Sequence, residues 1–476
     1  MKIWRISSVT LAIAVAFPLP AAAQSNAELL KELKALRDRV TQLENKLKAA
    51  ETPKPAPAAP VAAAPVAPAV VGMTPDQARE MGRIAVKVDA LEDDRENSFL
   101  KGLEIHGSID PAFIYNRAQD TAGFQFLQKY AGDSCSDNSS CYAYDNSFFG
   151  TATLDIVKQL EGGSIFRLTL MPDRGVGSFI NDGDIVHEAS ASIPLTDENT
   201  RLIVGQIPDW SGYELLPSAE NKLITHNLLF DLIAPLAYTG AGLELTRGDW
   251  VVKGVIGNMN ATKQSTGDKS PVVAYRADYS INEYSGIGFS GVHGKAANLV
   301  NEDTGNTGLN LFEVDGYFIR GDWTLQGQAS YGRQSDAAIA TVDNDNESYQ
   351  DAQWWGVSAL AAYKFTPRLE GVVRADYINN RKNGGGLLGF GADSVNGIGP
   401  GFDGSDGDGN PIPVESQHGA NRYALSLGGN YRFNEFTLFK LEYRFDFANK
   451  DVFYYVDKDS YKKNNQLFGA SVVVSF

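Results

Sequence analysis

From Lys101 onward, hydrophobic and polar residues alternate with a period of two, which is the pattern of half-buried β-strands. The clearest case is the last segment, where Phe468, Ala470, Val472, Val474 and Phe476 fall on one face of an extended strand. Small or mixed residues occupy the other face. A soluble protein gains little from an exposed terminal aromatic residue, whereas the last strand of an outer-membrane barrel faces lipid. This segment therefore predicts a strand of a membrane barrel.

Comparable alternation recurs along the chain and predicts an antiparallel transmembrane β-barrel of about sixteen strands. The predicted strands are 103–115, 148–160, 164–172, 185–194, 201–208, 239–247, 250–260, 271–281, 284–293, 309–320, 323–333, 352–365, 369–380, 422–433, 436–449 and 463–476.

The predicted connections alternate between short turns and long polar loops. The short ones are 161–163, 247–249, 282–283, 321–322, 366–368 and 434–435, with 195–200 a little longer. Long ones include 116–147, 209–238, 334–351 and 381–421. This alternation is typical of a membrane barrel with a periplasmic and an external rim. A soluble β-sandwich has no reason to show it.

The two faces of the longest strands differ in chemistry. In 436–447, apolar residues such as Phe439 and Leu441 alternate with Lys440, Glu442 and Arg444. The apolar set suits lipid and the charged set suits water, which is the reverse of a soluble barrel. A single soluble strand would also alternate, so the prediction rests on several such strands together.

Three segments precede the predicted barrel of residues 101–476. A basic start, an apolar core and small residues at 21–23 predict a cleaved signal peptide over 1–23. Residues 24–51 carry a heptad seam and predict a short coiled coil that associates with copies of itself. The seam consists of Leu29, Leu33, Leu36, Val40, Leu43 and Leu47. Residues 52–73 are rich in proline and alanine and predict an extended linker.

Residues 74–100 predict a further short helix. Thr74 can cap it, Pro75 suits its first position, and apolar residues recur at helical spacing from Met81 to Leu91. The pattern leaves two alternatives open, a plug inside the barrel and a periplasmic segment.

Composition narrows the function classes. The formal net charge of the 476 residues is -16, which argues against a nucleic-acid partner. The lone close pair Cys135 and Cys141 predicts one small disulfide loop in an exported protein, and no metal site or cofactor is expected. The five histidines show no paired metal spacing, and no nucleophile elbow is present. We therefore expect no enzyme, although a hydrolase on the rim needs so few residues that it stays an alternative.

Several stretches carry a family resemblance. They are 107–117, 226–231, 238–244 and 430–433. Together they resemble proteobacterial porin-like outer-membrane barrels, over about 101–476. The coiled coil and linker resemble those of trimeric porins with periplasmic helical extensions. The resemblance implies a pore in the outer membrane, with membrane lipid around it, but supplies no substrate.

The predicted functional site is the barrel lumen. With the N-terminal segment in the periplasm, loop 209–238 is the third external loop, and in general porins the loop at this position folds inward and narrows the channel. Its candidate constriction residues are Asp209, Trp210, Glu214, Glu220 and Lys222. The alternatives are packing at a trimer interface or covering the mouth.

Inward faces of the strands supply candidate pore-lining charges of both signs. They are Arg167, Lys253, Arg276, Arg374, Arg422, Arg432, Lys440 and Arg444 with Glu244, Asp278, Asp315, Glu370, Asp376, Glu442 and Asp446. Facing acidic and basic rows orient polar solutes, and they also stabilise the wall as cross-strand pairs. The predicted function is passive diffusion of small hydrophilic solutes through a homotrimeric outer-membrane porin. A substrate-specific channel and a plugged structural or adhesive barrel are the alternatives.

Overall fold

The structure is a computed structural model that describes residues 79, 81, 83–84, 86–87, 101–127, 150–172, 185–259, 271–298, 305–338, 351–381, 402–405, 411–413, 419–458 and 460–476. The predicted signal peptide, coiled coil, linker and Cys135–Cys141 disulfide lie outside these residues. Within 74–100, the described residues are helical, and the choice between a plug and a periplasmic segment stays a prediction. In the described part of the chain, no helix has both the length and the hydrophobicity to span a membrane.

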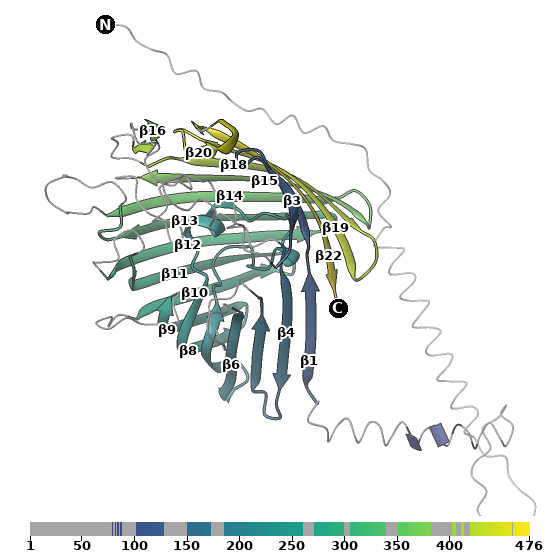
Figure 1. The fold of residues 1–476 in the computed structure, drawn as a ribbon. Coiled ribbons are helices and arrows are strands. Elements are labelled where there is room, and N and C mark those ends of the chain that lie inside the picture. The colour runs from purple at the N-terminus through teal and green to yellow at the C-terminus, as the bar shows by residue number, and fades with distance from the viewer. Residues whose placement is uncertain are drawn as a thin grey trace, which may run out of the picture. The chain divides into compact units, whose positions relative to one another are not determined.

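The described strands form one antiparallel sheet of 18 segments that closes on itself (Figure 1). The segments are β1 (Leu103–Ile109), β2 (Ala112–Asn116), β3 (Thr121–Gln125), β4 (Ala152–Gln159), β5 (Ile165–Leu170), β6 (Val186–Asp197), β7 (Thr200–Pro208), β8 (Ala237–Arg247), β9 (Trp250–Met259), β10 (Val272–Asn282), β11 (Ser285–Ala297), β12 (Asn306–Arg320), β13 (Trp323–Gln334), β14 (Ala352–Lys364), β15 (Leu369–Arg381), β18 (Arg422–Arg432), β19 (Thr437–Ala448) and β22 (Asn464–Ser475). Shorter elements lie in the loops: β16 (Phe402–Ser405), β17 (Pro411–Pro413), β20 (Phe453–Tyr455), β21 (Ser460–Lys462), η2 (Ser218–Glu220), α3 (Leu228–Ile233) and η4 (Val456–Lys458).

Two pairs of segments lie end to end, so the wall has sixteen strand positions. β1 and β2 are one strand interrupted at Asp110 and Pro111; antiparallel to them, β4 pairs with β1 and β3 pairs with β2. Proline cannot donate a ladder hydrogen bond, which accounts for the interruption. Every other strand pairs with its neighbours along the chain. The sheet closes where β22 pairs with β1 and β2. The predicted sixteen-stranded antiparallel barrel is confirmed.

The seam of the barrel is held by reciprocal backbone hydrogen bonds. The Gly107 amide donates to the Phe476 carbonyl at 3.1 Å, and the Phe476 amide donates to the Gly107 carbonyl at 3.0 Å. The Phe476 ring occupies the space that a Cβ at Gly107 would need. Glycine at this position therefore lets the aromatic ring lie flat against the first strand.

The wall is apolar outside and polar inside. On β19, the outward Leu441 is 54% exposed, whereas the inward Lys440 is 2% exposed. Outward aromatic residues recur near both rims, among them Trp250, Trp323 and Tyr423. The sequence predicts this inverted polarity, and the arrangement suits a wall that faces lipid.

The described short turns lie at one rim, as predicted, and the strand ends joined by the longer connections lie at the other. Two details differ from the expectation. The segment 116–147 contains β3, and β6 continues to Asp197, so only two residues join β6 to β7. Both differences arise because strand pairing extends beyond the alternating pattern.

Three glycines in register mark a close approach of neighbouring strands at β7, β8 and β9. Gly205 pairs with Gly240, and Gly240 pairs with Gly257. A Cβ at Gly240 would lie 2.2 Å from the Ile256 carbonyl oxygen, and Gly205 has a φ of 122°. Side chains do not fit there, so glycine permits a tight bend of the wall next to the loop that enters the lumen.

Candidate functional site

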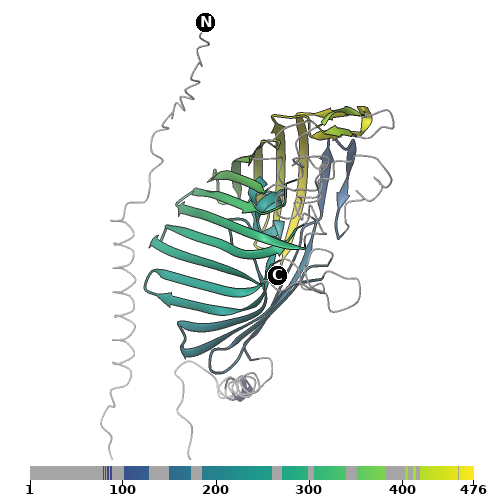
Figure 2. The same cartoon turned by 90° about the vertical axis from the view of Figure 1, so that its left-hand side faces the viewer.

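The lumen loop, defined here as residues 209–236, joins β7 to β8 and folds into the barrel. In Figures 1 and 2 the teal segment with α3 lies within the ring of strands. Its helix contacts β14, β15 and β18, which stand on the opposite wall. The loop therefore crosses the lumen instead of covering the mouth from outside.

Apolar side chains of α3 fix the loop to an apolar patch of that wall. Leu228, Leu229, Leu232 and Ile233 are buried in one cluster with inward residues such as Trp354. Asn227 caps the helix by accepting a hydrogen bond from the Phe230 amide at 2.8 Å. The run of apolar residues in this loop thus serves packing against the wall.

Glu442 of β19 accepts hydrogen bonds from the backbone of the loop. Its carboxylate accepts from the Ile224 amide at 2.7 Å, the Thr225 amide at 2.8 Å and the Thr225 hydroxyl at 2.6 Å. The carboxylate is almost fully buried, so these charge-assisted bonds replace the water that it would otherwise bind. This contact ties the loop to β19.

Arg374 of β15 ties the same stretch of loop to the wall. Its guanidinium donates to Glu214 at 2.8 Å, the Thr225 carbonyl at 2.6 Å and the His226 carbonyl at 2.8 Å, and it is completely buried. On its own strand it pairs with Asp376 at 3.2 Å. A buried guanidinium with this many acceptors holds the loop in one position.

Two further cations of β19 bind carbonyl groups of the loop. Arg444 donates to the His226 carbonyl at 2.6 Å and to Asp446 at 3.0 Å. Lys440 donates to the carbonyls of Ser218 at 2.7 Å and Asn221 at 2.6 Å. Each wall cation thus adds charge-assisted hydrogen bonds to carbonyl groups of the loop.

The start of the loop is fixed on the other side. Tyr238 donates to Asp209 at 2.5 Å, and Lys253 lies 5.0 Å from the ring centre of Trp210. Arg276 donates to the Trp210 carbonyl at 2.7 Å and pairs with Asp315 at 2.7 Å. The loop is therefore anchored at both ends of its course.

Two adjacent cavities lie between the loop and the wall of β1 and β4–β6. One, of about 220 Å³, lies toward the long-loop rim, and the other, of about 310 Å³, lies toward the short-turn rim. They share Arg167, Thr169 and Glu220 as lining residues. The loop thus leaves open space between itself and this part of the wall.

Charges of both signs meet at this shared boundary. Arg167 pairs with Asp155 at 2.9 Å and lies 3.6 Å from Glu188. Glu220 projects from the loop into the same space. Desolvation inside the lumen raises the pKa of Glu220 above its ordinary value, and the Arg167 guanidinium acts in the opposite direction. Three carboxylates therefore face one guanidinium.

The predicted site residues fall into three groups. The first comprises residues that lie under or against the loop, together with the wall residues beside them: Arg374, Asp376, Lys440, Glu442, Arg444, Asp446, Arg276, Asp278, Asp315, Lys253, Glu244, Asp209, Trp210 and Glu214, with Arg422 buried at the start of β18. The second borders the open cavities and comprises Arg167 and Glu220. The third lies at the short-turn mouth and comprises Lys222, Glu370 and Arg432. Their roles as pore-lining and constriction residues stay predictions.

Sequence reasoning missed Asp155 and Glu188 beside the open cavities. A signal was present, because Asp155 alternates with apolar residues along 152–159 and Glu188 precedes Ser190 and Ser192 on the same face. Both strands are short or rich in small residues, so the alternation is weaker there than on β19. Among the described residues, no group of three or more His, Cys, Asp or Glu side chains is placed to hold a metal ion.

No curated protein matches this chain. Solved structures with a similar fold include OmpT of Vibrio cholerae, with 10% identity and a TM-score of 0.48 over 79% of this chain and 97% of that chain. The outer membrane channel DcaP of Acinetobacter baumannii has 11% identity and a TM-score of 0.47, over 79% of this chain and 97% of that chain. An anion-selective porin from Comamonas acidovorans has 9% identity and a TM-score of 0.46, over 79% of this chain and 99% of that chain. At this identity and TM-score, the likeness says nothing about function.

Two family models match. One, described as a protein of unknown function (DUF3138), matches residues 4–270. The other, described as "Putative beta-barrel porin-2, OmpL-like", matches residues 148–476, which is most of the barrel and more than half of the chain. By this match, and with a closed barrel that is polar inside, the chain belongs to the OmpL-like beta-barrel porin-2 family.

Proposed function

We propose that this protein is an outer-membrane channel through which small hydrophilic solutes diffuse passively. Membership in a porin family and the inverted polarity of the wall support a transport role rather than an enzymatic one. The observation that carries the proposal is the lumen loop, which is fixed to one wall and leaves charged space along the other.

The route runs through the two cavities beside Arg167. Because the two cavities share lining residues, a solute that moves from one to the other crosses the boundary at Arg167. A solute there lies between Glu220 of the loop and Arg167 of the wall. Opposed charges orient a dipolar solute and replace part of its hydration, whereas an apolar solute gains nothing in exchange for the water it displaces. Hydrophilic solutes are favoured for this reason.

The charge balance at the boundary gives the channel a weak preference for cations. Asp155, Glu188 and Glu220 outnumber Arg167, so the local potential is negative. The covered cations Arg374, Lys440 and Arg444 contribute little, because carboxylates and carbonyls of the loop already surround them.

We further infer a homotrimer with short turns and N-terminal segment in the periplasm. The heptad seam within 24–51 supports this assembly, because a helix isolated by a proline-rich linker buries its seam against copies of itself. A chain that lacks residues 24–50 and still forms trimers would show that this helix does not drive assembly.

The test is the single-channel current of the folded protein in a planar bilayer. We expect stepwise currents in salt alone, with three equal steps per insertion for a trimer. The reversal potential in a salt gradient should favour cations, and Glu220→Gln should reduce that preference. Saturable block by one solute would favour a substrate-specific channel. A folded barrel without current would contradict the proposal and favour a plugged structural barrel.

A further inference from the structure

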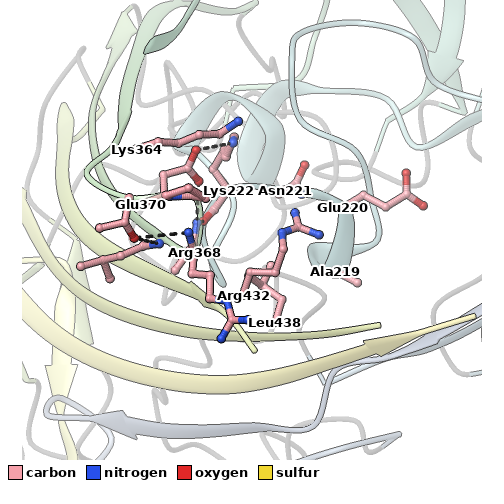
Figure 3. A pocket seen from close by; sticks show the side chains of 13 residues that line it. Ala219, Glu220, Asn221, Lys222, Lys364, Arg368, Glu370, Arg432 and Leu438 are labelled. Atoms are coloured by element: carbon pink, nitrogen blue, oxygen red, sulfur yellow. Dashed lines mark hydrogen bonds and ion pairs between the residues drawn. The ribbon is translucent and has the colours of Figure 1, made fainter. Parts of the chain in front are cut away.

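The short-turn mouth of the barrel holds a basic cavity of about 270 Å³. Its lining includes Lys364 at the end of β14, Arg368 in the turn before β15, and Arg432 at the end of β18. Figure 3 shows these three side chains around the cavity, together with Lys222 of the lumen loop. Four basic residues line the cavity against the two acidic residues Glu220 and Glu370, so the cavity is net positive.

Arg368 and Arg432 are direct neighbours across two strands. The Arg432 amide donates to the Arg368 carbonyl at 2.8 Å. Two residues further along each strand, Glu370 pairs with Asn430, and both side chains point inward. By the period of two, Arg368 and Arg432 also face the lumen. Like charges opposite each other on adjacent strands destabilise a sheet.

The nearby carboxylate does not offset this repulsion. Glu370 binds Lys222 at 2.7 Å and accepts from Asn430 at 3.1 Å. Among the ion pairs of the described residues, none includes Lys364, Arg368 or Arg432. The mouth therefore keeps three cations in one concave site without an acidic partner from the described chain.

We propose that this cavity is a binding site for small anions that carry a phosphate or a carboxylate group. Guanidinium groups donate two parallel hydrogen bonds to such oxygens, and two adjacent arginines suit a dianion better than a monovalent ion. The bound anion relieves the repulsion between Arg368 and Arg432. The site is separate from the acid-rich boundary at Arg167. Binding of the anion there does not depend on conduction through the barrel.

The experiment is isothermal titration of the folded, full-length protein in neutral detergent at low salt, with inorganic phosphate in one arm and succinate in the other. We expect saturable binding of at least one anion. The anion that binds more tightly shows whether the site prefers a phosphate or a carboxylate group. The double variant R368Q/R432Q should bind roughly tenfold more weakly or worse, because two charge-assisted donors are lost. Arg432→Gln alone should show a smaller loss.

Arg247→Gln is the matched control, because Arg247 lies at the same rim outside the cavity, where it donates to the Thr246 carbonyl at 2.7 Å. This variant should bind as the wild type does. No saturable binding by the wild type, or unchanged binding by R368Q/R432Q, would overturn the proposal. Absence of current in a protein that still binds the anion would count against the channel and support the site.

Discussion

Replacing Arg374 with methionine should release part of the lumen loop. Methionine is unbranched and replaces the aliphatic part of the arginine side chain, but it has no hydrogen-bond donors. The change leaves the Glu214 carboxylate and the carbonyls of Thr225 and His226 without the guanidinium that now lies within 2.8 Å of each. We expect the loop to loosen from the wall near Glu214, while α3 stays packed.

The structure sets the size of the effect. The Arg374 side chain has no exposed surface, so solvent screening does not reduce its ion pair with Glu214. Removing one partner of a buried pair costs about 3–5 kcal/mol. That cost corresponds to a shift of roughly a hundred- to several-thousandfold in the ratio of docked to released loop. Glu442, Arg444 and Lys440 still hold neighbouring groups, so the release should remain local.

The assay is single-channel conductance in symmetrical salt, together with protease digestion of the folded barrel. We expect a larger and noisier current and faster cleavage of the loop. Arg201→Met is the control, because Arg201 also faces inward but bonds only to Ser192 and the Gly163 carbonyl of the wall. If R374M matched the wild type in both current and protease resistance, the anchoring role of Arg374 would be refuted.

Two further predictions concern the boundary and the wall. Because desolvation raises the pKa of Glu220, its negative charge is present above that raised pKa and is lost as the pH falls through it. Cation preference, measured as a reversal potential, should therefore decline as the pH falls through a value above the usual range of glutamate. Glu220→Gln should abolish this pH-dependent decline. A decline that persists in the variant would exclude Glu220 as its source. Gly240→Ala should prevent folding, because its Cβ would lie 2.2 Å from the Ile256 carbonyl oxygen, whereas a Cβ at Gly429 has nothing within 4 Å, so Gly429→Ala should fold. Heat-modifiable migration in a gel distinguishes folded from unfolded barrel. Equal folding of the two variants would contradict the close approach at Gly240.

The period of two located most of the wall because lipid and water impose opposite demands on the two faces of each strand. The segment 352–365, for example, was predicted as a strand, and β14 spans Ala352–Lys364. β3 was missed because its five residues lie within a polar loop and are too few to show a period. Its position depends on pairing with β2, which is a tertiary contact.

The lumen is less predictable for a physical reason. Arg167 and Arg374 are both inward arginines on alternating strands, and nothing in their local sequence separates them. Arg374 is sealed by the loop, whereas Arg167 borders open space. The difference depends on the path of the lumen loop across the barrel, and that path is set by contacts between residues more than a hundred positions apart.

Ser218 of the loop has a consequence for the order in which the barrel assembles. Its hydroxyl donates to Asp110 at the break between β1 and β2, and its carbonyl accepts from Lys440 of β19, 222 positions further along. These two strands flank β22 on either side of the seam. The seam itself joins groups as far apart as Asp110 and Ser471, 361 positions, at a loop-closure cost of about 5 kcal/mol.

A single loop residue thus bridges the first and the penultimate strands from inside the lumen. The bridge cannot form until β19 has been added to the sheet, whereas the neighbouring hairpins can pair as they emerge. Once it forms, it holds both edges of the open sheet at the spacing that β22 must fill. The loop that crosses the lumen of the finished barrel therefore also links the two strands on either side of its seam.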